Sequence, residues 1–542
     1  MPAAESVINV CSGVRLDPRY DHTIYFATPS AQLNYFAGKV VKTFSAYSYL
    51  RKSWSLQVDA NMEDARTWTY LYFQNPQGGV MGKRYFYFIT NIEYKNNGMI
   101  ELQLELDVLQ TYLFDMQRLP CFVERQHTVT DNAGDHTVDE GLEVGELVDN
   151  SIWNWSDLQD LAIMVLSSIN PNHSTGTEPV DSLPYSYDGI FSGLTVWAID
   201  GQDWVQWGEQ LDALSAAGFA DGIFSMWMYP KALITLGGED SWDNAALCHV
   251  VKSSLPVGSR INIGSKPATV ANMETPPKNK KLLTFPYSML YVTNNAGGSA
   301  VYRYERFGND EIYFGAAGTM SPDASVKIFP ETYNGLANAS EHLFNFDQGL
   351  SMSGYPVCAW DVDTYKMWLA QNQNQHQLAG ATAAGTMIAG AATAIASGLT
   401  GNVMGAVGGV GAVVSGASQI AGLLAQKADM RVQPDQARGN FSASVNAAAG
   451  KLTFSFIHKS VSEEQARIID DYFTMYGYRI NRVKTPDIAA RPAFTYVKTV
   501  GCKIGGNLCT DDILKIESIF DHGVTWWKDG DAIGDYSQPN QP

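Results

Sequence analysis

The chain has 542 residues, of which 45% are hydrophobic and 12% aromatic, and its formal net charge is −19. This length and composition predict several folded domains with apolar cores, roughly three or four. The negative charge argues against a protein that binds nucleic acid by electrostatic attraction. The six cysteines are too sparse for a disulfide scaffold, and they show neither a CxxC motif nor zinc-type Cys/His spacing.

Residues 1–150 predict a β-rich region. The clearest run, 99–108, alternates apolar and polar residues, as a strand does when only one of its faces is buried. Aromatic runs at 70–73 and 85–89 predict further strands. The sequence Asn-Asn-Gly at 96–98 predicts a hairpin turn before the long strand. The polar face of that strand would carry Glu101, Gln103, Glu105 and Asp107.

Two interpretations of this acidic face stay open. It is either a solvated outer face, the usual fate of polar strand positions, or the wall of a channel. In a channel, carboxylates would repel phosphate and let DNA slide without sticking.

Residues 151–360 predict strands broken by Gly, Pro and Asn, with one helix at about 203–217. The run 276–281 predicts an exposed basic turn. The acidic residues of the loop at 131–140 predict a solvated loop. A cation site is the less favoured alternative, because the EF-hand spacing is absent. These acidic residues are Asp131, Asp135, Asp139 and Glu140.

Motifs of catalysis are missing from the sequence. It contains no HExxH, P-loop, GxSxG or Rossmann glycine pattern. We therefore expect neither an enzyme nor a cofactor nor a metal, although a pair of glycosidase carboxylates stays open. The first residues hold neither a basic nor an apolar region, so we expect no secretory signal.

Residues 377–426 form an uncharged segment that also lacks histidine, and 25 of the 47 residues at 379–425 are Ala or Gly. A turn-like cluster at 398–402 divides it into spans 378–399 and 403–425, each about long enough to cross a bilayer as a helix. The segment has few bulky apolar residues, so the insertion of one copy into a bilayer would be marginal. This favours several copies acting together. The alternative is a flexible Gly/Ala-rich linker.

We predict that 378–425 is a membrane-active loop, either a helical hairpin or an extended segment. Three glycines at GxxxG spacing, Gly401, Gly405 and Gly409, would let helices pack closely in lipid. The apolar residues of this loop are Leu378, Met387, Ile388, Ile395, Leu399, Val403, Met404, Val407, Val410, Val413, Val414, Ile420, Leu423 and Leu424.

The remainder predicts an α+β region. After a polar stretch at 427–439, residues 440–457 alternate as a strand does. Ser462 and Gln465 form a capping box that opens a helix ending near Gly477. A second helix would be capped by Thr510 and end before 523. The predicted domains are 1–150, 151–360, 361–439 (hinge helix and loop) and 440–542.

Several motifs in this order resemble the tail knob, or distal tail tube, proteins of small picovirus-type podophages, such as those of Bacillus. The resemblance covers roughly half of the chain, at both ends, and 151–280 is too divergent to align. The matching segments are 84–95, 106–111, 122–127, 139–142, 355–360, 476–484, 491–497 and 519–524.

The resemblance implies a mainly β fold with a few helices. Its tube domain would be a β-barrel built from the N- and C-terminal parts, with an inserted knob region. It also implies a homohexamer at the distal tip of the tail, in the virion, joined to other tail proteins such as the proximal tail tube or lower collar. Viral DNA would pass through the lumen without specific binding. The apolar loops would plug the tip, then form a pore in the host membrane for genome ejection.

Two alternatives stay open beside this resemblance. One is a receptor-binding or cell-wall-degrading tail-tip protein, which would need a carboxylate constellation within 151–360. The other is a free pore-forming toxin, which would need a secretory signal.

Overall fold

The computed structural model forms two compact units. It describes residues 6–47, 55–77, 80–96, 98–155, 160–172, 186–187, 190–191, 195–217, 219, 222–237, 240–251, 259–271, 273–319, 324–334, 346–353, 355, 357–359, 438–440 and 453–542. Unit 1 comprises Met1–Glu146, Asn272–Tyr287 and Val461–Pro542, and unit 2 comprises Leu147–Ala271 and Ser288–Ser460. Both ends of the chain therefore belong to unit 1. The fold is mainly β with a few helices, as predicted.

The N-terminal part of unit 1 is a six-stranded antiparallel sheet, which ends at β3 on one side and at β4 on the other. The hairpin between β6 and β7 pairs Asn96 with Met99, as the sequence predicts. In sheet order, the strands are β3 (Val40–Tyr47), β1 (Ser6–Ser12), β5 (Trp68–Gln77), β6 (Val80–Asn96), β7 (Met99–Leu106) and β4 (Ser55–Asp59).

This sheet is buried on both faces where β5 lies. Leu71 and Phe73 pack into a core with residues of β1 and β7, whereas Tyr70 and Tyr72 pack into a second core shared with the C-terminal part. Helix α1 (Pro29–Ala37) covers the second face, where the ring of Phe36 stacks on that of Tyr70 at a centroid distance of 5.2 Å. Alternating side chains of one strand therefore serve two cores.

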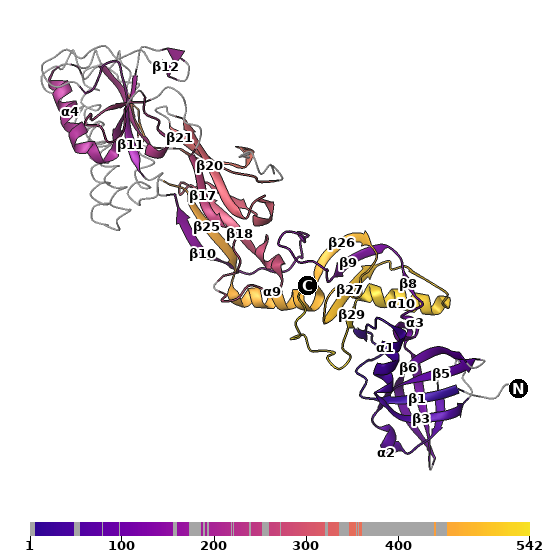
Figure 1. Ribbon diagram of the computed structural model, residues 1–542. Helices are drawn as coiled ribbons and strands as arrows, with labels where there is room; N and C mark the ends of the chain where they lie inside the picture. Colours follow the sequence, from indigo (N-terminus) through magenta and orange to yellow (C-terminus); the bar gives the residue numbers. More distant parts are fainter. Residues whose placement is uncertain are drawn as a thin grey trace, which may run out of the picture. The chain divides into compact units, whose positions relative to one another are not determined.

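A second sheet in unit 1 interleaves the two ends of the chain (Figure 1). Strand β9, from the N-terminal part, lies between two C-terminal strands, β26 and β27. In sheet order, the strands are β2 (His22–Ile24), β29 (Val524–Trp527), β27 (Phe494–Val500), β9 (Cys121–Gln126) and β26 (Tyr478–Lys484). The smaller elements of unit 1 are α2 (Met62–Ala65), α3 (Val108–Tyr112), and the paired strands β8 (Gln117–Arg118) and β28 (Ile504–Gly505).

Two helices of unit 1 lie where the sequence places them. Helix α9 (Glu463–Tyr476) begins after Ser462, whose hydroxyl accepts from the backbone N–H of Gln465, and ends at Gly477 with φ of 63°. The reciprocal bond of the capping box, from the N–H of Ser462 to the Gln465 side chain, is not among the hydrogen bonds of the described residues; the Gln465 side-chain N–H donates to the carbonyl of Glu143. Helix α10 (Thr510–His522) begins one residue earlier than predicted, since its N-cap residue is Cys509.

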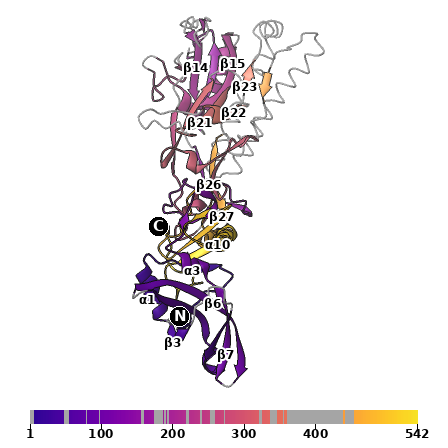
Figure 2. The ribbon, with the colours of Figure 1, turned by 90° about the vertical axis from the view of Figure 1, so that its right-hand side faces the viewer.

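Unit 2 is built around an extensive apolar core that includes Trp207 and Trp227. Helix α4 (Trp204–Ala216) confirms the helix predicted at about 203–217. In Figure 2, β14 and β15 lie in one sheet together with β23. That sheet has the order β16 (His249–Val250), β14 (Thr195–Asp200), β11 (Leu161–Ser167), β15 (Ile223–Pro230), β23 (Val357–Ala359) and β24 (Arg438–Asn440).

Two further sheets and a short strand pair complete unit 2. One sheet has the order β17 (Ser259–Ser265), β20 (Glu311–Thr319), β21 (Ser325–Pro330) and β22 (Leu350–Ser353). The other has the order β10 (Leu147–Asn154), β25 (Ser455–Val461), β18 (Ser288–Thr293) and β19 (Ser299–Tyr302). The pair is β12 (Ser186–Tyr187) with β13 (Ile190–Phe191).

Candidate functional site

The predicted membrane-active loop, 378–425, lies outside the described residues, as do the stretches predicted to flank it, 361–377 and 427–437. Of the helices in the described ranges, none combines the length and the apolarity that a membrane crossing requires.

The polar face of β7 holds three of the four predicted channel-lining residues. Along this strand Ile100, Leu102 and Leu104 are buried, and they alternate with half-buried or exposed polar side chains. The polar side chains are those of Glu101, Gln103 and Glu105.

Each of these three polar side chains has a partner. Glu101 forms an ion pair with Lys95 at 2.6 Å, across the β6–β7 hairpin. The Gln103 amide donates to Glu93 at 2.7 Å. Glu105 pairs with Lys515 of α10 at 2.7 Å. The face therefore has mixed charge, with lysines against both acidic residues of β7.

Asp107 does not belong to this face, and the prediction that places it there is wrong. The strand ends at Leu106, and Asp107 is the N-cap residue of α3, where its carboxylate accepts from the N–H of Gln110 at 3.1 Å. Its other oxygen accepts from the hydroxyl of Tyr70 at 2.8 Å. The residue is only 1% exposed. Burial raises the pKa of Asp107 to about 6, because water no longer solvates the charged form.

The acidic loop at 131–140 is not simply solvated, because Asp131 and Glu140 are buried. Asp131 accepts from the hydroxyl of Tyr478 at 2.6 Å and from the N–H of Lys280 at 3.1 Å. The described part of the chain contains no cluster of His, Cys, Asp or Glu that could hold a metal ion.

Glu140 is the centre of a buried ion cluster. Its carboxylate forms ion pairs with both Arg125 and Lys281 and also accepts from the N–H of Arg479 at 2.9 Å. The Lys281 ammonium donates to the carbonyl of Val138 at 2.7 Å. Desolvation lowers the pKa of Lys281, although the neighbouring Glu140 opposes this shift. The basic turn predicted at 276–281 is therefore only partly exposed.

A second buried acid connects the same turn to helix α9. The carboxylate of Asp470 accepts from the backbone N–H of Lys278 and of Asn279, both at 2.9 Å. The Asn279 amide also donates to this carboxylate, at 2.8 Å. Sequence reasoning missed Asp470 and Asn279 because nothing local marks them: the two residues are 191 positions apart.

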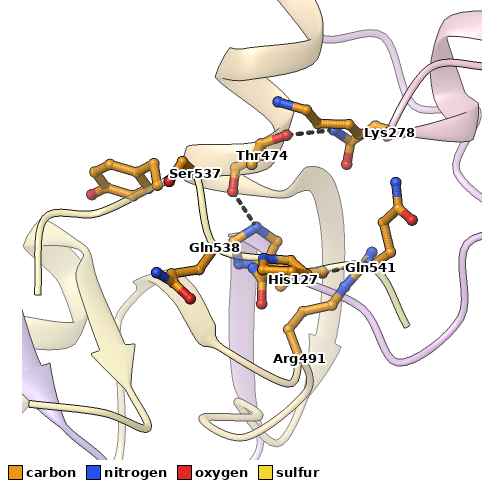
Figure 3. A pocket seen from close by; sticks show the side chains of 11 residues that line it. His127, Lys278, Thr474, Arg491, Ser537, Gln538 and Gln541 are labelled. Atoms are coloured by element: carbon orange, nitrogen blue, oxygen red, sulfur yellow. Dashed lines mark hydrogen bonds between the residues drawn. The ribbon is translucent and has the colours of Figure 1, made fainter. Parts of the chain in front are cut away.

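His127 lies beside this junction, among residues of α9 and β27 (Figure 3). Its Nδ1 accepts from the N–H of Tyr496 at 2.8 Å, so its Nε2 carries the proton and donates to the carbonyl of Thr474 at 3.0 Å. Burial and, to a smaller extent, the charge of Arg491 lower the pKa of His127 to about 3. A neutral imidazole with both nitrogens occupied is a structural group here.

These buried polar groups join three separate segments of the chain: the loop after β9, the turn at 276–281, and α9 with β26. Asp131, Glu140 and Asp470 each accept hydrogen bonds from residues of segments other than their own. The arrangement stabilises the fold, and these buried groups do not include a side-chain nucleophile hydrogen-bonded to a base, the pairing on which covalent catalysis relies.

Two sequence profiles of known families match the chain. The profile of the C-terminal domain of the tail knob protein gp9 of Bacillus phage phi29 matches residues 257–541. The profile of the N-terminus of the caudoviral major tail protein matches residues 4–117, which include the whole six-stranded sheet.

Curated relatives match over the full length. The tail knob protein gp9 of Bacillus phage B103 is 25% identical over 609 aligned residues, which cover 100% of this chain and 99% of the relative. The tail knob protein gp9 of Bacillus phage phi29 is 24% identical with the same coverage. Among solved structures, the tail knob protein gp12 of bacteriophage C1 is similar in fold, with a TM-score of 0.67, 16% sequence identity and coverage of 98% of both chains.

Proposed function

Because the chain belongs to the family of the phage tail knob protein gp9, we propose that several copies of it form a tube that conducts DNA at the tip of a phage tail. The chain is a structural protein of the virion, located at the distal end of the tail, and it is not an enzyme. As a tail knob protein it associates with other tail components and with copies of itself. We propose six copies, as the resemblance implies.

The apolar segment 378–425 gives this tube a second role. We propose that it closes the tip before infection and enters the host membrane afterwards. The observation that carries this step is the lack of charge across 377–426 in a chain whose net charge is −19. Burial of apolar surface lowers the free energy by about 25 cal/mol per Å². Packed segments of several copies would hide that surface inside the tube, and a bilayer would replace this packing after release.

The polar face of β7 supports the DNA-conducting role. Glu101 and Glu105 are paired with lysines, so the face would neither strongly attract nor strongly repel a duplex. A surface of this kind lets a polyanion pass, because tight binding of DNA requires many unpaired cations.

Deletion of 379–425 tests the membrane step. Full-length protein and the deletion variant are assembled, imaged by negative stain, and added to vesicles loaded with a fluorescent dye. We expect tubes from both proteins and dye release only from the full-length protein. Equal dye release by the two proteins would refute the membrane role.

A matched pair of substitutions tests whether helix packing in lipid matters. Gly405 lies at GxxxG spacing from 401 and 409, whereas Gly411 lies off this series. If the segment packs as helices, Gly405→Leu should reduce dye release more than Gly411→Leu, because leucine separates closely packed backbones. An equal effect of the two substitutions would argue against packed helices.

A further inference from the structure

Two cysteine thiols from opposite ends of the chain meet in unit 1. Cys121 is the first residue of β9, and Cys502 lies just after the end of β27. Both residues are 5% exposed and belong to the same apolar core. The two thiols interact with each other through a hydrogen bond, and neither is part of a disulfide in this structure.

The backbone brings these cysteines together. Strands β9 and β27 are adjacent (Figure 1), with Phe122 opposite Val500. The antiparallel pairing continues past both strands, because the N–H of Leu119 donates to the carbonyl of Lys503 at 3.0 Å. Cys121 therefore lies opposite position 501. Opposite Cα atoms in an antiparallel pair are about 4.5–5.5 Å apart, and a disulfide joins Cα atoms about 4.4–6.8 Å apart, so the next residue, 502, is near enough for such a bond.

Gly501 allows Cys502 to face the core that holds Cys121. In a regular strand successive side chains point to opposite faces, so Cys502 would lie on the face away from Cys121. Gly501 interrupts this alternation with φ of 63°, and both thiols are buried in one core. The N–H groups of Gly501 and Cys502 donate to the carboxylate of Asp521, at 3.1 and 3.0 Å. These bonds hold the turn in place.

The formation of a disulfide removes two electrons and two protons from the two thiols, and a small-molecule disulfide such as oxidised glutathione accepts them. The thiolate of one cysteine attacks oxidised glutathione and releases one glutathione thiol. The thiolate of the other cysteine then attacks the protein sulfur of the mixed disulfide and releases the second glutathione thiol. Burial raises the pKa of Cys502 to about 12, so few thiolates form in the folded chain and the exchange is slow there.

We propose that Cys121 and Cys502 form a disulfide in an oxidising medium. A structural protein of the virion is exposed to such a medium outside the cell, where disulfides persist. The bond joins β9 to the C-terminal part of unit 1. A cross-link between residues far apart in the sequence stabilises a fold mainly because it restricts the unfolded chain. The oxidised protein should therefore unfold at a higher urea concentration than the reduced protein.

Incubation of the full-length protein in glutathione buffers of graded oxidising strength tests the proposal. One sample is folded and the other is kept in urea, and each is followed until the linked fraction is constant. After free thiols are blocked with iodoacetamide, mass spectrometry of unreduced peptides measures the bond between Cys121 and Cys502. We expect the folded protein to form this bond at a ratio of oxidised to reduced glutathione about 100-fold lower than the unfolded chain requires. Free thiols at both positions in the most oxidising buffer, or equal ratios for the two samples, would overturn the proposal.

Two variants make the test specific. Cys502→Ser removes one thiol of the pair, so oxidation should no longer raise the urea midpoint. Cys509→Ser is the matched control, because Cys509 is an exposed cysteine nearby in the sequence. This variant should keep both the linked peptide and the full rise of the midpoint on oxidation. Loss of the rise in Cys509→Ser, or a rise that persists in Cys502→Ser, would assign the cross-link to other cysteines and refute the pair.

Discussion

Glu140 shows at the residue scale how unit 1 depends on single buried charges. Its side chain is fully buried and compensates two cations, Arg125 and Lys281, which are themselves 8% and 3% exposed. A buried ion cluster contributes little net stability compared with apolar packing. Removal of one member is nevertheless costly, because it leaves uncompensated charge in the interior.

We therefore expect Glu140→Gln to lower the free energy of unfolding by about 3–5 kcal/mol, because both cations would lose their counterion. Urea denaturation followed by circular dichroism measures this change. Glu143→Gln is the matched control: the carboxylate is exposed, and its loss should cost less than about 0.5 kcal/mol. Equal midpoints for the two variants would contradict the role of Glu140.

His127 makes unit 1 sensitive to acid. Its pKa is lowered from 6.5 to about 3 in the folded protein. Between pH 6.5 and about 3, His127 therefore binds a proton in the unfolded chain but not in the folded chain. The stability supplied by a neutral His127 is present above pH 6.5 and is lost, at about 1.4 kcal/mol per pH unit, as the pH falls toward 3.

The comparison of wild type with His127→Gln isolates this effect from other titrating groups. We expect the wild type to be more stable at pH 7, because Gln does not reproduce both hydrogen bonds of the imidazole. That advantage should shrink by more than 1 kcal/mol at pH 5, by about 1.4 kcal/mol for each unit below 6.5. Urea midpoints at both pH values provide the measurement, and a pH-independent difference would count against a buried neutral histidine.

At the scale of elements, one residue ends β7 and begins α3. Asp107 follows the last residue of the strand and accepts from the N–H of Gln110 in the first turn of the helix. It also accepts from Tyr70 of β5. The carboxylate thus fixes the direction in which the chain leaves the sheet.

Asp107→Ala should destabilise the protein by about 2–4 kcal/mol, since it removes a helix cap and leaves the Tyr70 hydroxyl without its acceptor. Asp107→Asn retains an acceptor, so its cost at pH 7 should be clearly smaller. Because burial raises the pKa of Asp107 from 3.8 to about 6, wild-type stability contributed by this group falls as the pH rises through that range. Thermal unfolding of the two variants measures the order of their stabilities. An equal loss of stability in both would contradict the role of Asp107 as a helix cap.

The elements that the sequence predicts well are those with a local signal. Alternation along 99–106, the turn at 96–98 and the serine before α9 each act within a few residues, and the structure contains all three features. Alternation fails at Asp107 because a helix cap overrides strand periodicity there. The burial of the acids at 131 and 140 cannot be predicted in this way, for another reason. Their partners Tyr478 and Lys281 lie 347 and 141 positions away, and no local pattern reports such contacts.

At the scale of the whole molecule, unit 1 cannot be assembled from either end of the chain alone. Strand β9 pairs with β26 on one side and with β27 on the other, so an N-terminal strand completes a C-terminal sheet. The turn at 276–281 then joins both parts through Asp470 and Glu140. Unit 1 is therefore built from both ends of the chain and from Asn272–Tyr287, and the two segments of unit 2 lie between these parts in the sequence.

The proposed tube makes a prediction about which face of this element meets DNA. If the polar face of β7 lines the channel, every copy contributes one Gln103 to the wall. Gln103→Lys would then add a ring of cations at an exposed position. Lysines facing a duplex neutralise phosphates and release counterions, so binding becomes strong and steeply dependent on salt.

Assembled Gln103→Lys protein should therefore retain short duplex DNA at low salt and release it as salt rises from about 50 to 200 mM. Wild-type assemblies should retain little DNA under either condition, because Glu101 and Glu105 already neutralise the lysines beside them. Gln206→Lys on helix α4 is the matched control, since it adds the same charge at an exposed position of unit 2. Co-sedimentation of labelled DNA with the assemblies measures retention. Equal retention by the two variants would place the polar face of β7 on the outer surface of the tube.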